Sequence, residues 1–467
     1  LTISDSVETI GDYAFYNCRA FEELALSEDL KTIGNWAFQN CIGLKNISIG
    51  KNLSSISSTA FYGDTALENI EVSEDNATYS DYDGALLNKE QTSILLYPKS
   101  KAGDYTIPDT VTSIGDRAFE NSVGLTGINT GNGVKNIGVC AFNGCTALKN
   151  AVIGDSVETI AESAFNYCTS LKSVKLPDSV ESIGTSAFRN DDAITEVTFG
   201  NGIKTIGNSA FYDCDSITAV RIPSSLTYLG NSSFANCDSL KNIEINGNGA
   251  TIGNYAFQYC NNVESIVIGD GVKNINYGAF YDNRNLKSLT ISDSVETIGD
   301  YAFYNCRSLT QAIFGKGITS IGNNAFTGFS DLTTYCHEDS YTHNYLKNLS
   351  NVTIKLISEN YFVVDLGINK LSNNSVTFTW KKPNGYENID HYIINKDGVK
   401  YDETNDTSYT DTKLESGREY TYSVCAVDTE GVVSESRSIK VIPACSKVNS
   451  IMLPNGNNKI GGLKSIK

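Results

Sequence analysis

The stretch "SDSVETIGDYAFYNCR" (Ser4–Arg19) occurs a second time, unchanged, at Ser292–Arg307. The identity extends backwards, so that Leu1–Arg19 and Leu289–Arg307 are the same nineteen residues, 288 positions apart. Each copy contains a phenylalanine that follows an alanine. Such phenylalanines recur along the chain, with Phe234 after a serine instead of an alanine, at Phe15, Phe38, Phe61, Phe119, Phe142, Phe165, Phe188, Phe211, Phe234, Phe257, Phe280, Phe303 and Phe326. The duplicated segment is therefore one unit of a longer series.

The spacing of the series is constant. Successive phenylalanines are 23 residues apart, except for a step of 58 between Phe61 and Phe119, which is two periods plus 12 residues. A fixed period of this length predicts a solenoid, in which each unit is too small to bury its own apolar face and shares a core with its neighbours.

One unit contains two apolar pairs and a return segment. Counted from Phe165, aliphatic residues stand nine and eleven positions on, at Val174 and Leu176, and again at Val180 and Ile183. A spacing of two predicts a strand that points alternate side chains inward. The "GxxAF" segment that follows predicts a short helical or 3-10 turn that returns the chain to the next strand.

Eight units have cysteine three residues after the phenylalanine. These are Cys18, Cys41, Cys145, Cys168, Cys214, Cys237, Cys260 and Cys306, whereas Asp64, Ser122, Asp191 and Asn283 hold this place in other units. A thiol that alternates with small polar residues predicts a weak donor facing backbone carbonyls. Adjacent cysteines would lie within disulfide reach, at about 5 Å, but the exchange with aspartate and serine favours free thiols.

The repeat resembles a known family. The pattern "IGxxAFxxCxxLxxhxhPxxVxxIG", best seen at Ile160–Gly184 and Ile206–Gly230, resembles the BspA-like leucine-rich repeats over roughly Leu1 to Ile357. The resemblance implies a leucine-rich repeat solenoid. It also implies a bacterial-type adhesin or host-interaction protein that is extracellular or on the cell surface.

Two segments within residues 1–357 break the period. Residues 79–108 resemble the irregular island of such proteins, and the apolar "ALL" and "SILLY" on either side of Asn88–Gln91 predict a hairpin. Residues 327–357 predict a C-terminal cap, with an amphipathic helix at Tyr341–Leu349 and a closing strand at Val352–Ile357. A cap is expected because the last apolar unit must be covered.

A second domain is predicted at residues 360–443. The stretch "SVTFTWKK" (Ser375–Lys382) alternates apolar and polar residues, and about seven short strands with turn signals predict an all-β Ig-like sandwich. The tryptophan and the later "GREYTYSVCAVD" resemble a fibronectin type III domain, with Tyr420 at the place of its tyrosine corner. Residues 444–467 predict a linker or tail.

The composition argues against several partners. The net charge of −18 and pI of about 4.7 disfavour nucleic acid and anionic lipid, because both are themselves negative. No run of 18 apolar residues is present, so no membrane insertion is predicted for this stretch. Leu1 falls inside a repeat strand, and we expect further sequence upstream of it.

No catalytic or cofactor motif is recognised. His337, His343 and His391 have no zinc-ligand spacing, and no metal or cofactor is predicted. The acidic turn "SEDNATYSDYDG", with Glu74, Asp75, Asp81 and Asp83, carries oxygen ligands that calcium could use. Because a closing glutamate loop is absent, a solvated acidic turn is favoured, and Asp81 and Asp83 are only a weak calcium candidate.

The surface offers two candidate binding faces. The outward strand positions, eight and ten residues after each phenylalanine, are small and polar and predict a bland sheet rather than a glycan- or peptide-reading face. Tyrosines instead crowd three successive return segments, at Tyr255, Tyr259, Tyr277, Tyr281, Tyr301 and Tyr304. Tyr281 and Tyr304 are 23 residues apart and should stack at about 5 Å. These rings either shield backbone or form a partner-binding surface.

The sequence therefore predicts a non-enzymatic, monomeric surface or secreted protein that binds an unidentified host or extracellular protein or glycan. One alternative is an accessory binding region of a larger secreted enzyme, which a neighbouring catalytic domain would reveal. Another is an intracellular scaffold, which a signal peptide on the full-length gene would rule out.

Overall fold

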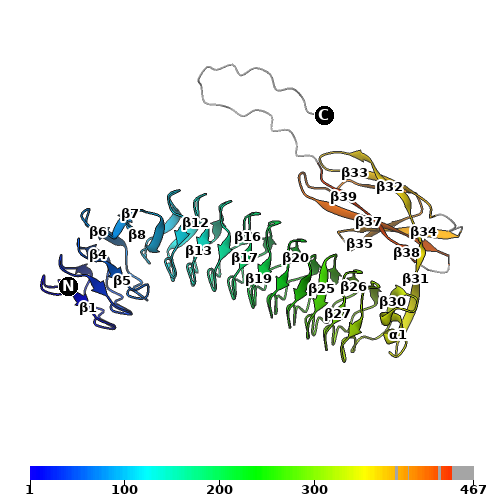
Figure 1. Cartoon of the computed structure of the whole chain (residues 1–467), viewed down its shortest axis with the longest axis horizontal. Helices are drawn as coiled ribbons and strands as arrows, with labels where there is room; N and C mark the ends of the chain where they lie inside the picture. Colours follow the sequence, from blue (N-terminus) through cyan, green and yellow to red (C-terminus); the bar gives the residue numbers. More distant parts are fainter. Residues whose placement is uncertain (384–387, 398, 430–432, 444–467) are drawn as a thin grey trace, which may run out of the picture. The chain divides into compact units, whose positions relative to one another are not determined.

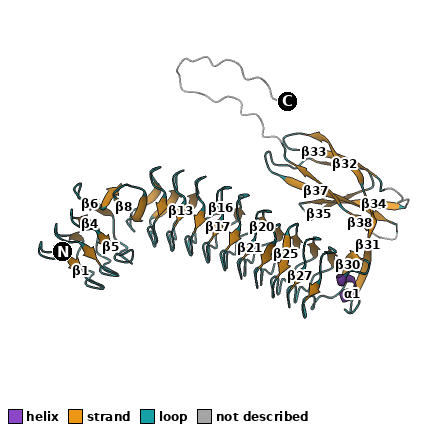
Figure 2. Cartoon of the chain, viewed as in Figure 1, coloured by secondary structure: helices purple, strands orange, loops and turns teal. Residues whose placement is uncertain are grey.

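The computed structural model describes residues 1–383, 388–397, 399–429 and 433–443, and it divides into two compact units, Leu1–Ile357 and Ser358–Lys467. The first unit is a solenoid of stacked rungs (Figure 1). The second is all-β. Figure 2 shows how little helix there is: α1 (Tyr341–Leu346) is the one α-helix in the described part of the chain. The predicted repeat solenoid followed by an all-β domain is confirmed.

Each regular rung has two strands, which form two columns of parallel pairs. The longer strands are β2 (Glu23–Ala25), β4 (Asn46–Ile49), β6 (Asn69–Val72), β10 (Gly103–Thr106), β12 (Leu125–Asn129), β14 (Asn150–Val152), β16 (Ser173–Lys175), β18 (Glu196–Thr198), β20 (Ala219–Ile222), β22 (Asn242–Ile245), β24 (Ser265–Ile268), β26 (Ser288–Ile291), β28 (Gln311–Phe314), β30 (Leu332–His337) and β31 (Val352–Phe362). Residues 23 apart pair, as Val174 pairs with Val197.

The second column consists of shorter strands. They are β1 (Thr9–Ile10), β3 (Thr32–Ile33), β5 (Ser55–Ile56), β11 (Ser113–Ile114), β13 (Asn136–Ile137), β15 (Thr159–Ile160), β17 (Ser182–Ile183), β19 (Thr205–Ile206), β21 (Tyr228–Leu229), β23 (Ala250–Ile252), β25 (Val272–Ile275), β27 (Thr297–Ile298) and β29 (Ser320–Ile321). The same register holds here, as Ile160 pairs with Ile183.

Alternation along the longer strands decides what is buried. In β18, Val197 points into the core while Glu196 and Thr198 are exposed. The repeat phenylalanines stack behind these strands in two series, from Phe15 to Phe61 and, beyond the island, from Phe119 to Phe326. Phe211, for example, is completely buried between Phe188 and Phe234, with ring centroids 5.1 and 4.9 Å away. This phenylalanine stack fills the space between the strands and the return segments.

The return segments are turns, so the predicted helical conformation is wrong. The N–H groups of Ser186, Phe188 and Asn190 donate to carbonyls of the next rung at 2.7 to 2.9 Å, and not to carbonyls four residues back. Ser186 and Asn190 also have φ values of 55° and 60°. A left-handed residue cannot continue a right-handed helix. The same two positions have positive φ in most rungs, which directs alternate N–H groups along the solenoid.

The cysteines lie in the core of these turns. All described cysteines are free. We call the cysteines that stand three residues after a repeat phenylalanine the ladder cysteines, and the seven of them from Cys41 to Cys306 are buried. Each buried ladder thiol donates to the carbonyl of the phenylalanine 26 residues earlier, as Cys214 Sγ does to Phe188 at 3.0 Å. The predicted contact between a weak donor and a backbone carbonyl is confirmed.

The island region contains one more strand than the hairpin predicted from sequence. β7 (Tyr79–Tyr82), β8 (Ala85–Asn88) and β9 (Ser93–Leu96) form an antiparallel meander, and β9 then pairs in parallel with β11. After β9, Tyr97 takes a phenylalanine's place. Its ring stacks on Phe119 at 4.7 Å, and its N–H donates to the carbonyl of Ala118. The insertion thus includes an irregular rung.

Beyond the last regular rung, β30 is followed by α1, whose N-terminus is capped by the Ser340 hydroxyl, which accepts the N–H of His343 at 3.0 Å. α1 ends three residues before the predicted helix does. β31 then pairs in parallel with β30, from Val352 to Ile357.

The second unit packs two antiparallel sheets around an aromatic core. One sheet holds β32 (Val364–Leu371), β33 (Val376–Lys381) and β36 (Ser408–Asp411); the other holds β34 (Ile389–Lys396), β35 (Val399–Thr404), β37 (Tyr420–Asp428), β38 (Val433–Glu435) and β39 (Arg437–Val441). The Tyr420 hydroxyl accepts the N–H of Glu415 at 2.8 Å, which confirms the tyrosine corner. The predicted tail, residues 444–467, lies outside the described residues.

We predict that Phe211→Ala strongly destabilises the solenoid. It removes a buried ring that contacts two others, and such truncations cost about 3–5 kcal/mol. Because each rung contacts only its neighbours, the damaged rung should separate unfolding into two blocks. Calorimetry should show a lower, split transition. A single transition at the parent temperature would show that Phe211 does not hold the stack together.

We also predict that the seven buried ladder thiols react slowly. Burial raises the pKa of Cys145 and of Cys306 to about 12, so that little thiolate is present at neutral pH. Thiol titration should label the partly buried Cys18 and Cys140 first, and the ladder only after denaturant is added. A mass lower by two hydrogens per cysteine pair would instead reveal disulfides.

Candidate functional site

The six tyrosines singled out in the sequence come together on the return segments of three adjacent rungs. We call Tyr255, Tyr259, Tyr277, Tyr281, Tyr301 and Tyr304 the tyrosine patch. Tyr259 and Tyr277 are each 41% exposed, and the other four rings are partly buried. The inner positions of these rungs are occupied by buried alanine and phenylalanine, which leaves the tyrosines on the outside.

The rings pack against one another in a connected series. Tyr281 and Tyr304 stack with centroids 5.1 Å apart and planes at 22°, which confirms the predicted contact. Tyr301 meets Tyr304 edge-to-face at 5.5 Å, although the segment between them is not helical. Tyr259 meets Tyr281 in the same way at 5.9 Å. Each ring is therefore held by a neighbour, which lowers the entropy that a binding partner would have to remove.

A glycine makes room for the other half of the patch. Tyr255 meets Tyr277 edge-to-face at 5.3 Å, and Tyr277 meets Tyr301 at 5.5 Å. A Cβ placed on Gly278 would lie 2.7 Å from the Tyr255 ring, and Gly278 has a φ of 58°. Gly278 stands two residues before its repeat phenylalanine. The glycine could have been noticed in the sequence, because this position is serine at Ser232 and in the three regular rungs before it.

Arginines border the patch. The Arg284 guanidinium donates two hydrogen bonds to the buried carboxylate of Asp282, with its closest approach at 2.7 Å, and its side chain remains 54% exposed. In the next rung, Arg307 donates to Asn305 Oδ1 at 2.8 Å. Tyrosine and arginine are the residues that protein-binding hot spots favour.

The outward face of the longer strands is different. In β16 and β18, Ser173, Lys175, Glu196 and Thr198 are exposed and none is aromatic. This face matches the small, polar surface expected from the sequence.

The acidic turn of the island uses its carboxylates within the fold. Asp81 Oδ1 accepts the N–H of Val72 at 2.9 Å, and Asp83 forms an ion pair with Lys101 at 2.7 Å. In the described part of the chain, no three His, Cys, Asp or Glu side chains gather as a metal site would require.

The histidines are occupied by local contacts. His343 Nδ1 accepts the N–H of Asp339 at 3.0 Å, and His391 Nδ1 lies 2.9 Å from Asp390. The third, His337, is buried in β30.

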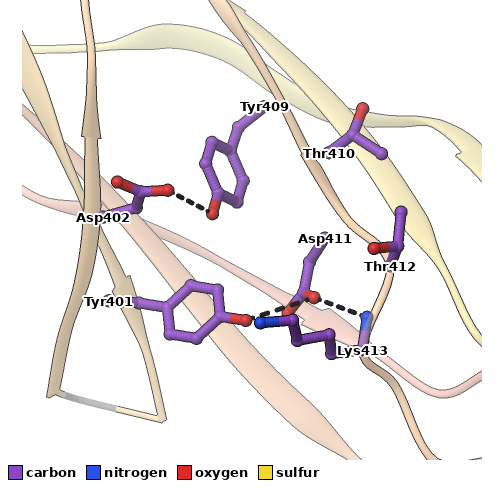
Figure 3. Close-up of a pocket in the computed structure, with 7 residues that line it drawn as sticks. All are labelled: Tyr401, Asp402, Tyr409, Thr410, Asp411, Thr412 and Lys413. Carbon is purple, nitrogen blue, oxygen red and sulfur yellow. Dashed lines mark hydrogen bonds between the residues drawn. The ribbon is translucent and has the colours of Figure 1, made fainter.

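The second unit has a pocket that the sequence did not predict. Two tyrosine rings and two carboxylates are among the groups that line this pocket (Figure 3). The Tyr409 hydroxyl donates to Asp402, and the Tyr401 hydroxyl donates to Asp411. Behind the pocket, Lys396 Nζ lies 2.6 Å from Asp411. Burial opposes ionisation of Asp411, but hydrogen bonds from Lys396 and from Tyr422 outweigh it and hold the pKa of Asp411 below its usual value.

This ion pair is satisfied inside the domain. Lys396 Nζ also lies 4.5 and 4.8 Å from the ring centroids of Tyr420 and Tyr401, positions that favour a cation. Asp411 Oδ1 accepts the Lys413 N–H at 2.8 Å. The ion pair thus links β34 of one sheet to β36 of the other.

The structure thus defines a leucine-rich repeat solenoid joined to a fibronectin-like domain, and the family comparisons agree. The sequence profile of the BspA type leucine rich repeat region matches residues 1–88, 95–218, 204–333 and 250–377, and that of the fibronectin type III domain matches residues 363–442. The chain belongs to the BspA-type leucine-rich repeat family. Neither matching profile describes an enzyme.

Two solved structures are similar to this chain, and the first shows the same fold. A leucine-rich repeat protein from Bacteroides ovatus is 25% identical, with a TM-score of 0.53, over 77% of this chain and 92% of its own. A leucine-rich cell surface protein from Faecalibacterium prausnitzii is 23% identical over 71% of this chain and 91% of its own, with a TM-score of 0.38. No helix in the described residues is long and apolar enough to cross a bilayer.

We predict that Gly278→Ser loosens the tyrosine patch and leaves the rung intact. Serine is accepted at this position in four other rungs with positive φ, for example at Ser209 and Ser232. Here its Cβ would displace the Tyr255 ring. The far-ultraviolet circular dichroism and the melting temperature should change little, while the near-ultraviolet tyrosine signal should fall. An unchanged near-ultraviolet spectrum would contradict the close packing of Tyr255 on Gly278.

Proposed function

We propose that this protein is a non-enzymatic cell-surface or secreted protein that adheres to an extracellular protein or glycan through its solenoid. The tyrosine patch is the contact surface, and the fibronectin type III domain acts as a spacer or second binding module. The protein acts as a monomer. The observation that carries this proposal is the patch itself, six mutually packed tyrosines bordered by arginines on the return segments of three adjacent rungs.

Three features support the patch as a binding surface. Its rings bury one another only in part, so apolar area remains for a partner. The rings are held by contacts between 5.1 and 5.9 Å, which reduces the cost of ordering them. The neighbouring Arg284 and Arg307 place donors beside the rings in a chain of net charge −18.

The proposed location at the cell surface is supported by the family and by the descriptions of similar solved structures. The Faecalibacterium prausnitzii relative is described as a cell surface protein, and another structure in the comparison is a pneumococcal vaccine antigen. Adhesion suits a long solenoid, because a repetitive surface can present contacts far from its point of attachment.

We predict that a Tyr281/Tyr301/Tyr304→Ser variant loses binding on an array of glycans and extracellular-matrix proteins. Removing three aromatic contacts should weaken binding to a ligand captured by the parent by roughly tenfold or more. The control is Tyr167/Tyr228/Tyr341→Ser, which removes three exposed tyrosines outside the patch, with exposures of 52%, 38% and 46%.

Both variants must first show the parent's circular dichroism spectrum. If the patch variant binds as tightly as the parent, the patch is a structural feature and this assignment is wrong. If the parent captures no glycan or matrix protein on the array, the adhesion proposal itself fails.

A further inference from the structure

In most rungs the side chain three residues after the repeat phenylalanine donates a hydrogen bond to a backbone carbonyl; the buried hydroxyl of Ser122, which has no partner, is an exception. The carbonyl of Phe142 accepts the N–H of Cys145 at 3.1 Å and the thiol of Cys168, one rung further, at 3.2 Å. The other buried ladder thiols repeat this contact, as Cys260 does with Phe234 at 3.1 Å. In each of these rungs the side chain supplies a hydrogen to a carbonyl that has no access to water.

An amide serves the same purpose. Asn283 stands at this position, and its Nδ2 donates to the carbonyls of Phe257 at 2.9 Å and Phe280 at 2.8 Å. The chemistry of the residue can change from thiol to amide, but the donor remains.

Asp191 stands at the same position, three residues after Phe188, but an ionised carboxylate has no hydrogen to donate. Its Oδ1 accepts the N–H of Cys168 at 2.6 Å, which leaves Oδ2 as the atom equivalent to the donating sulfur. Asp191 is completely buried, and its Oδ2 has no hydrogen-bonding partner. The carbonyl that corresponds to this rung is that of Phe165. An ionised carboxylate can only accept, so two acceptors would face each other in the core.

The surroundings of Asp191 offer no counter-charge among the described residues. The titratable groups that interact with it are the carboxylate of Asp192 and the thiols of Cys145, Cys168 and Cys214, whose pKa values its charge would raise. Burial, with a further contribution from Asp192, raises the pKa of Asp191 well above its usual value, against the Cys168 N–H, which lowers it.

Asp64 repeats this geometry in another rung. Its Oδ1 accepts the N–H of Cys41 at 2.8 Å, and its Oδ2 is likewise buried and unpartnered. Burial raises the pKa of Asp64 to about 8, but the charge of the buried Lys99 amine opposes this shift, whereas none of the cations that the structure describes acts on Asp191. Asp191 is therefore the unambiguous case.

We propose that Asp191 is a neutral carboxylic acid in the folded protein at neutral pH, donating its Oδ2–H to the carbonyl of Phe165. It completes the donor ladder that the cysteines make elsewhere, and it makes the solenoid more stable in mild acid than at neutral pH. The proton is taken up from solvent when the chain folds.

The direction of the pH effect follows from the proton count. In the unfolded chain an aspartate ionises near its ordinary pKa of about 3.9. Between that value and the raised folded pKa, the folded state holds one more proton than the unfolded state. Stability therefore falls as pH rises through this window, and it is greatest at its acidic end.

The test compares urea unfolding midpoints at about pH 5 and about pH 8 for the parent, Asp191→Asn and Asp155→Asn. Asparagine keeps a donor, as at Asn283, but cannot titrate. The parent midpoint should be higher at the lower pH, and Asp191→Asn should lose a large part of that difference. Asp155 is exposed, so Asp155→Asn makes the same side-chain substitution outside the core and should keep the parent's pH dependence.

Infrared spectroscopy of the folded proteins gives an independent readout. The parent and Asp155→Asn should both show, at neutral pH, the absorption of a buried protonated carboxyl group that Asp191→Asn lacks. If Asp191→Asn folds poorly, Asp191→Cys restores the ladder's commonest residue and takes its place. Unchanged pH dependence in the Asp191 variant, or no carboxyl absorption lost with it, would show that Asp191 is ionised and would overturn the proposal.

Discussion

Stacking of one phenylalanine ring on the next, once per 23 residues, is the interaction on which the solenoid depends. From Phe119 to Phe326 the centroids of successive rings are 4.7 to 5.3 Å apart, which is also the spacing of hydrogen-bonded strands. One rung cannot bury its ring alone, and each needs the next. This shared burial favours a constant period, because each ring must meet the next, although the step of 22 residues from Tyr97 to Phe119 also keeps the contact.

The island shows what the constraint tolerates. The chain adds an antiparallel meander there, yet it returns to the parallel column at β9 and supplies Tyr97 as a substitute ring on Phe119. The substitute keeps the backbone contact as well, through its N–H to the carbonyl of Ala118. The insertion thus divides the core into two clusters, and the second series of stacked rings starts on the substitute ring of Tyr97.

The inner constraint also explains where variation is free. Phenylalanine, alanine and the ladder position face the core, so changes there must preserve volume and a donor. The outer positions of the return segments have no such requirement, and they change from serine at Ser232 to tyrosine at Tyr255 and glycine at Gly278. A binding surface can therefore be built on these turns without disturbing the stack. In the same return segments, the outer positions carry the tyrosine patch and the inner position carries the hydrogen-bond donors.

The sequence by itself determined the period, the strands, the buried residues, the free donors at the cysteine positions and the Tyr281–Tyr304 stack, because all of these repeat with the register. It also indicated the fibronectin-like domain, through alternation around Trp380. Only the tertiary structure decided what depends on neighbours outside the repeat. The return segments are turns because their N–H groups bond between rungs, Tyr97 replaces a phenylalanine, and Lys396 meets Asp411 from another strand. Periodicity reports the contacts that recur, and a contact made once leaves no pattern in the sequence.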